Sequence, residues 1–104
     1  MYQLIVYVPQ DHLAQVKQAI FDAGAGRFEQ YEHCCWQTKG EGQFKPLLGS
    51  NPAVGEVGQE VEQEPEYKIE TICREADIHS VIQALKHSHP YEEPAYAVWA
   101  LVDI

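Results

Sequence analysis

The alternation of strand and helix patterns is the strongest constraint on what this 104-residue chain can fold into. Residues 2–8 are apolar and β-branched, end at Pro9, and predict a first strand. A helix is expected next, with Asp11 as its N-cap and Gly24 just past its end. Its apolar positions share one face: Leu13, Val16, Ile20 and Ala23. The chain therefore begins with a strand and an amphipathic helix.

The rest of the chain predicts further strands at residues 31–38, 67–73 and 95–102. A second helix opens at Ala76 or Asp77, and its apolar stripe is Ile78, Val81, Ile82 and Leu85. The order is βαββαβ, in which two right-handed crossovers are joined through an antiparallel middle. We therefore expect an α+β, ferredoxin-like sandwich with a four-stranded antiparallel sheet and both helices on one face.

Both faces of the first and last predicted strands are apolar. In residues 95–102, for example, Val98 points to one side and Trp99 to the other. Two helices cover only one face of such a sheet, so the other face needs a different cover. We expect a homo-oligomer built sheet to sheet. The alternative is a monomer whose long loop folds over the open face.

Composition and charge exclude several classes of function. Seven Lys and Arg against sixteen Asp and Glu give a formal net charge of −9, and the basic residues are scattered, so no nucleic-acid partner is expected. No signal peptide and no apolar stretch of about 18–20 residues is evident, so no membrane association is expected. The three cysteines lack a Cys-x-x-Cys pair and fit reduced thiols in the cytoplasm. One domain over residues 1–104 is expected.

A long loop, residues 39–66, separates the second and third predicted strands. Loops longer than about 12–15 residues within compact domains are usually functional or disordered. Its first half predicts ordered structure anchored by Phe44 and by Leu47 or Leu48. Its second half is acidic and is expected to be solvated, with a short strand near residues 57–61.

The corner between the second helix and the last strand concentrates polar chemistry between two prolines. Proline restricts its own φ and the conformation of the preceding residue, so this corner should be stiff. Tyr91, Glu92 and Glu93 are candidate ligand-binding residues. The two carboxylates would otherwise accept backbone N–H groups or pair with Lys or Arg of a neighbouring subunit. No nucleophile accompanies them, so no catalytic residue is assigned and enzyme activity is not expected. The remaining alternative is a metal-assisted hydrolase in which the two carboxylates act as paired acid and base.

Histidines supply the metal candidates. His87 and His89, together with the two glutamates of the corner, have donor atoms that suit Zn or Cu. His33 with Cys35 is a second candidate, since both should point to the same side of one strand. The structural alternatives are a solvated helix face for His87, a partly buried ring bonded to the backbone for His89, and core packing for the cysteines.

An anion site is a further candidate. Gly40-x-Gly42 could present backbone N–H groups to an anion, helped by Lys39 and Lys45. The alternative is that these glycines, and those of Gly55-x-x-Gly58, only permit turns.

Many glycine, proline and aromatic positions along the chain follow one spacing. They are Gly24-Ala25-Gly26, Tyr31, Cys34, Gly40-x-Gly42-x-Phe44-x-Pro46, Gly49-x-Asn51-Pro52, Gly55-x-x-Gly58 and His89-Pro90-Tyr91-Glu92-Glu93. This pattern resembles the PII/CutA-like domain inserted in the NGG-interacting-factor-three-like proteins. The chain departs from the pattern at Phe28-Glu29, at Gln43 and at Pro65-Glu66-Tyr67.

The resemblance implies a ferredoxin-like fold, trimers like those of PII and CutA proteins, and a long loop that reaches ligands or partners. The full-length relatives carry a dinuclear metal centre in a separate core domain, which we expect to lie outside these residues. We therefore expect an oligomeric binding or sensor module that holds a small ligand or a metal ion between subunits. The cofactor is unknown, with a divalent metal ion as the candidate. The alternative is a protein-protein interaction module that acts through the acidic loop without a small ligand.

Overall fold

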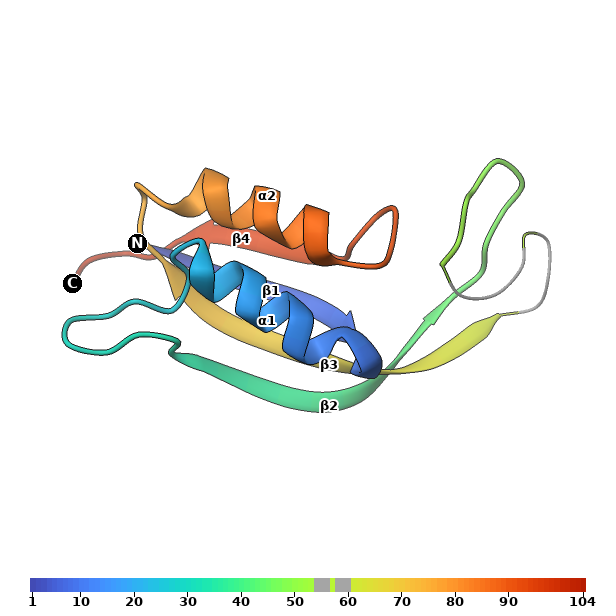
Figure 1. Cartoon of the computed structure of the whole chain (residues 1–104), viewed down its shortest axis with the longest axis horizontal. Coiled ribbons are helices and arrows are strands. Elements are labelled where there is room, and N and C mark those ends of the chain that lie inside the picture. Colours follow the sequence, from blue (N-terminus) through green and yellow to red (C-terminus); the bar gives the residue numbers. More distant parts are fainter. Residues whose placement is uncertain (54–56, 58–60) are drawn as a thin grey trace.

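The computed structural model describes residues 1–53, 57 and 61–104, and its architecture confirms the predicted α+β sandwich. Four strands form one antiparallel sheet in the order β2-β3-β1-β4, and both helices pack on the same face (Figure 1). The elements are β1 (Tyr2–Pro9), a 3-10 turn (Gln10–His12), α1 (Leu13–Asp22), β2 (Cys35–Phe44), β3 (Glu62–Cys73), α2 (Ile78–Ser88) and β4 (Tyr96–Ala100).

The core lies between the sheet and the two helices, and β1 runs through its centre. Alternate residues of β1 point towards the helices and are fully buried: Leu4, Val6 and Val8. Ile69 of β3 lies opposite Val6 in the register and is buried on the same face. The helices contribute the apolar positions that the sequence predicted, among them Val16, Ile20, Val81 and Leu85. Among the described residues, neither helix has the length and apolar character needed to cross a bilayer.

The other face of the sheet, which we call the open face, carries no helix. By register it presents Gln3, Ile5, Tyr7, Trp36, Thr38, Lys68, Glu70, Ile72, Ala97 and Trp99. Trp36 and Trp99 remain 69% and 46% exposed, which is unusual for large aromatic side chains. Lys68 and Glu70 form an ion pair of 3.8 Å in the middle of this face. The structure thus contains the uncovered apolar face that the strand patterns predicted.

The start of α1 and the start of β2 differ from the sequence prediction. Asp11 is not an N-cap: it lies in the 3-10 turn, and α1 begins after His12 with no side-chain cap. β2 begins at Cys35 rather than residue 31, because the preceding loop is bonded to the sheet in another way. The Gly26 N–H donates to the Ile72 carbonyl at 2.7 Å, and the Cys34 N–H donates to the Gly26 carbonyl at 2.9 Å. These bonds hold the loop in an irregular path.

The largest difference is that much of the predicted long loop is sheet. β2 continues to Phe44 and β3 already begins at Glu62, so the two strands form a long hairpin that extends beyond the rest of the sheet (Figure 1). We call this hairpin the arm. Its strand pairing outweighs the weak β-propensity of its Gly, Glu and Lys residues. The strand expected near residues 57–61 falls largely outside the described residues.

The anchors of the loop were predicted in part. Phe44 is half-buried, as expected, but Leu47 and Leu48 are 68% and 90% exposed, and the buried residue beside them is Pro46. Residues 46–53, which we call the strap, leave the arm and turn towards the end of α2. Pro46, rather than Leu47 or Leu48, therefore packs the strap against the rest of the domain.

Gly26 provides a test of how the loop before β2 is held. Its φ is +79°, and a Cβ atom there would lie 2.7 Å from the Cys34 backbone nitrogen. Gly49 also has a positive φ, +95°, but a Cβ atom there would meet nothing within 4 Å. We expect Gly49→Ala to lower the free energy of unfolding by about 1–2 kcal/mol, the conformational cost alone, and Gly26→Ala to lower it further. Urea denaturation measures both; equal losses would show that the contact with Cys34 carries no cost.

Candidate functional site

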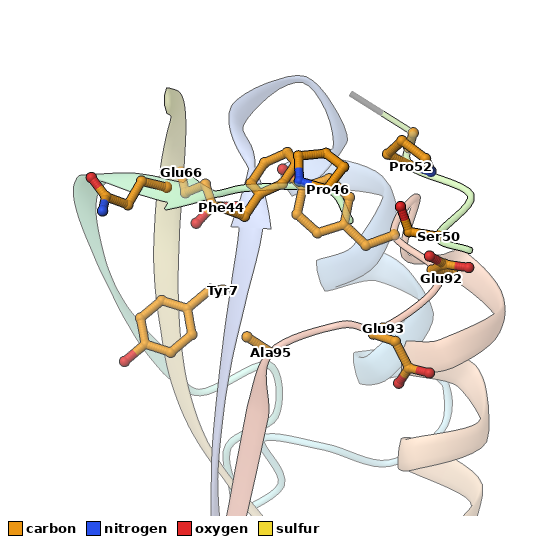
Figure 2. Close-up of a pocket in the computed structure, with 12 residues that line it drawn as sticks. Tyr7, Phe44, Pro46, Ser50, Pro52, Glu66, Glu92, Glu93 and Ala95 are labelled. Carbon is orange, nitrogen blue, oxygen red and sulfur yellow. The ribbon is translucent and has the colours of Figure 1, made fainter. Parts of the chain in front are cut away.

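A pocket of about 250 Å³ lies where the arm, the strap and the corner meet (Figure 2). The corner is residues 89–95, between α2 and β4. The pocket is therefore built from segments that are far apart in the sequence. Its lining residues are Tyr7, Gln43, Phe44, Pro46, Ser50, Pro52, Ala53, Glu66, Tyr91, Glu92, Glu93 and Ala95.

His89 holds the corner against the end of β1. Its ring is almost fully buried, and Nε2 lies 2.8 Å from the Tyr7 carbonyl oxygen. Nδ1 accepts a hydrogen bond from the Tyr91 N–H at 3.1 Å. A carbonyl oxygen can only accept, so these two bonds assign the neutral tautomer with its proton on Nε2. Burial lowers the pKa of His89, the Tyr7 carbonyl opposes this, and His12 lowers the pKa further.

Tyr91 connects this anchor to the arm. Its ring centroid lies 5.1 Å from that of His89 and 5.6 Å from that of Phe44, both in tilted geometry. Its hydroxyl is buried next to Glu66, although no group in the described structure gives it a well-aligned hydrogen bond. Burial and the charge of Glu66 raise the pKa of Tyr91, so the phenol stays protonated. Tyr91 thus lines the pocket and holds a buried hydroxyl group beside Glu66.

Glu66 occupies space that Gly42 leaves free. A Cβ atom on residue 42 would collide with the Glu66 carboxylate, so the Glu66 side chain can keep this position only while residue 42 is glycine. Gly40, two residues earlier on β2, has open space around it. Burial raises the pKa of Glu66, its contact with Tyr91 opposes the rise, and the negative charge of Glu64 adds to it. The result is a partly desolvated carboxylate at the wall of the pocket.

The strap is attached to the corner by one long-range hydrogen bond. The Asn51 N–H donates to Glu92 Oε1 at 2.8 Å. Within the strap, the Ser50 hydroxyl donates to the Leu47 carbonyl at 2.7 Å and closes a turn. Glu92 therefore accepts a backbone N–H, one of the alternatives that the sequence left open, while Glu93 lines the same pocket. Figure 2 shows Glu92 beside Ser50, below Pro52.

No established family profile matches the chain. Over 103 residues it is 45% identical to the GTP cyclohydrolase 1 type 2 homolog of Halalkalibacterium halodurans, a match that covers 99% of this chain and 27% of that protein. Its structure resembles that of a Bacillus cereus protein related to NIF3, with a TM-score of 0.81 and 38% identity over 98% of this chain and 26% of the other. The chain matches the PII/CutA-like domain of the NIF3-related proteins. It spans about a quarter of the length of these relatives.

The fold is also that of CutA. CutA1 from Pyrococcus horikoshii superposes on this PII/CutA-like domain with a TM-score of 0.68 and 15% identity, over 100% of this chain and 86% of that protein. At this level of identity the similarity concerns the fold alone.

The domain brings together only some of the residues that the sequence proposed for a ligand. Tyr91, Glu92 and Glu93 line the pocket. Lys39, Gly40 and Gly42 line an adjoining depression of about 400 Å³ on the arm, which shares Tyr7 and Glu66 with the pocket, and Lys45 lines neither cavity.

Sequence reasoning missed Glu66 and Tyr7. Neither belongs to a short motif, and only the register of β3 against β1 and β2 places them at this junction.

The metal candidates do not converge. Both nitrogens of His89 are engaged with backbone atoms, and His87 lies exposed on α2. His33 has a φ of +59°, precedes β2 and stacks on Phe21 at 4.9 Å, so it does not share a strand face with Cys35. Within residues 1–53, 57 and 61–104, no three His, Cys, Asp or Glu side chains are grouped to hold a metal ion. The residues present therefore do not fit the metal sites that the sequence suggested.

His89 predicts a dependence of stability on pH. Its pKa is lowered in the folded domain, so the unfolded chain binds more protons once the pH falls below about 6.5, the ordinary histidine value. Stability from His89 is therefore present above that pH and is lost on acidification. We expect His89→Gln to be less stable at pH 7 but to lose less stability between pH 7 and about pH 5 than the wild type. Urea midpoints at both pH values test this, and an unchanged difference between the two proteins would contradict it.

Proposed function

We propose that this PII/CutA-like domain is a non-enzymatic module that binds a small ligand in the pocket between arm, strap and corner. The observation that carries the proposal is the Asn51–Glu92 hydrogen bond, which joins the strap to the corner beside a mostly apolar cavity that Glu92 helps to line. Its volume of about 250 Å³ is slightly below the range of drug-sized ligand sites, which begins at about 300 Å³, so only a compact molecule would fit. Such an enclosure with a few polar groups is typical of sites for small molecules.

The relatives are named GTP cyclohydrolase 1 type 2 homologs, but this name is no reason to propose catalysis by the domain. The matched region is 27% of the GTP cyclohydrolase 1 type 2 homolog of Halalkalibacterium halodurans. We make no proposal of cyclohydrolase activity for this domain, since that name describes a protein almost four times as long.

Gly42 and Gly40 provide a matched pair of variants for the pocket. An added methyl group at residue 42 must displace the Glu66 carboxylate, whereas at residue 40 it meets open space. In a screen of small metabolites by ¹H–¹⁵N NMR, we expect hits to shift the amides of Asn51, Tyr91 and Ala95. Gly42→Ala should weaken those hits by about tenfold or more, the loss of one charged contact, and Gly40→Ala should leave them unchanged.

Two results would contradict this proposal. One is that every hit binds Gly42→Ala as well as the wild type. The other is that the folded domain gives no hit, which would favour a protein-interaction module acting through the acidic segment 54–64. Most of that segment lies outside the described residues.

We also propose that the domain is a homo-oligomer, with a trimer favoured by the resemblance to PII and CutA proteins. The open face supports this, because Trp36, Tyr7 and Trp99 are large aromatic side chains left exposed on one side of the sheet. Tyr7 belongs both to the open face and to the pocket. An oligomer built through this face would therefore place a second subunit beside the ligand.

Trp99 tests the oligomer directly. We expect sedimentation equilibrium of the wild type at micromolar concentration to give a multiple of 11.8 kDa. Trp99→Glu should shift the mass towards the monomer, because a charge cannot be buried at an apolar interface without a partner. Leu48→Glu is the control, since Leu48 is 90% exposed on the strap, away from the open face. A monomeric wild type, or equal effects of both variants, would contradict the proposal.

A further inference from the structure

The charged side chains that line the pocket in the described part of the chain are all acidic. Glu66, Glu92 and Glu93 line it, and no Lys, Arg or His is among its described lining residues. From residue 46 to residue 61 the sequence contains no basic residue at all, so the undescribed part of this segment adds no positive charge. Charges interact strongly where water is partly excluded. A phosphate or carboxylate group would therefore be repelled, and a cation would be attracted.

The shape of the pocket distinguishes an organic cation from a metal ion. Much of its wall is apolar, with Phe44, Pro46 and Ala95 facing the cavity, and these side chains cannot ligate a metal. Its carboxylates do not form a metal-binding group with any third His, Cys, Asp or Glu that the structure describes. An ion would also leave most of the 250 Å³ unfilled, whereas a compact molecule with an apolar body would contact this wall.

Two groups on one wall suit a protonated amine. The Glu66 carboxylate has lost part of its hydration, so a cation beside it would replace that lost stabilisation. The buried Tyr91 hydroxyl lies next to it and has a free lone pair that an ammonium N–H can donate to. The rings of Tyr7, Phe44 and Tyr91 line the same cavity, and aromatic faces attract cations.

We infer that the ligand of this pocket is a small organic cation, a protonated amine carried on an apolar body, held by Glu66 and Tyr91 against the aromatic wall. This inference rests on the proposed function, because it names the class of ligand for the same pocket. It also distinguishes this pocket from the adjoining depression on the arm, which shares Tyr7 and Glu66 with the pocket but has Lys39 and Lys68 among its lining residues.

Three probes with the same ring separate charge from shape: benzylamine, benzyl alcohol and benzoate. With the full chain at near-neutral pH and about 0.15 M salt, where surface charges are screened, each is titrated by ¹H–¹⁵N NMR. We expect benzylamine to shift the amides of Asn51, Tyr91 and Ala95 and to bind at least about tenfold more tightly than benzyl alcohol. Benzoate should not shift these amides.

Variants then locate the charge. Glu66→Gln should weaken benzylamine by about tenfold or more and leave benzyl alcohol unchanged, because the amide keeps the shape and removes the charge. Glu41→Gln is the control, since it removes an exposed carboxylate from the same arm without touching the pocket. Comparison of the ¹H–¹⁵N spectrum of each variant with that of the wild type shows whether the fold is retained.

The inference is overturned if benzyl alcohol or benzoate binds as tightly as benzylamine, or if benzylamine gives no shift at the pocket amides at tens of millimolar. It is also overturned if Glu66→Gln and Glu41→Gln have equal effects. In each case the proposed function stands as long as some other compound binds the pocket and is weakened by Gly42→Ala. The failure of the cation inference and the failure of the proposed function are therefore distinguishable.

Discussion

A single buried imidazole joins the core of the sandwich to its candidate site. The backbone N–H of His89 donates to the Leu85 carbonyl at 2.9 Å at the end of α2. The ring of His89 is hydrogen-bonded to the Tyr7 carbonyl through Nε2 and to the Tyr91 N–H through Nδ1. Pro90 follows at once and restricts the backbone, so the corner leaves the helix in one direction. Tyr91 then packs on both His89 and Phe44. Core, corner and arm are thus linked through adjacent rings, and the pocket depends on that chain of contacts.

The arm supplies Glu66, a carboxylate of the site whose pKa is raised by burial. In the register of β2 with β3, Gly40 lies opposite Glu66 and Gly42 opposite Glu64, so the Glu66 side chain can lie across the neighbouring glycine. A glycine at residue 42 weakens a strand by itself, because it has no side chain to pack. Here its missing Cβ gives room to a carboxylate that lines the pocket. Glu66 lies in the acidic first part of the inner strand β3, and burial there leaves its carboxylate partly desolvated.

The acidic character of the whole chain and that of the pocket have different consequences. A net charge of −9 spread over the surface disfavours nucleic acid and is largely screened by salt. Three carboxylates around a mostly apolar cavity of about 250 Å³ would instead favour cations among the small molecules of our proposal, because screening is weaker where water is partly excluded. The similarity to NIF3-related proteins covers about a quarter of their length, so these conclusions concern the PII/CutA-like domain and its pocket.

The sequence by itself determined the order of the elements, the buried faces of both helices, the apolar open face and the stiff corner with a buried histidine. These follow from local periodicity and from proline, which act over a few residues. Only the tertiary structure decided where β2 begins, that residues 39–44 and 62–66 are strand, and that Glu66 meets Tyr91. Gly- and Glu-rich segments have little strand propensity of their own and become sheet through a distant partner. The register of that pairing, which no local pattern encodes, places the carboxylate at the pocket.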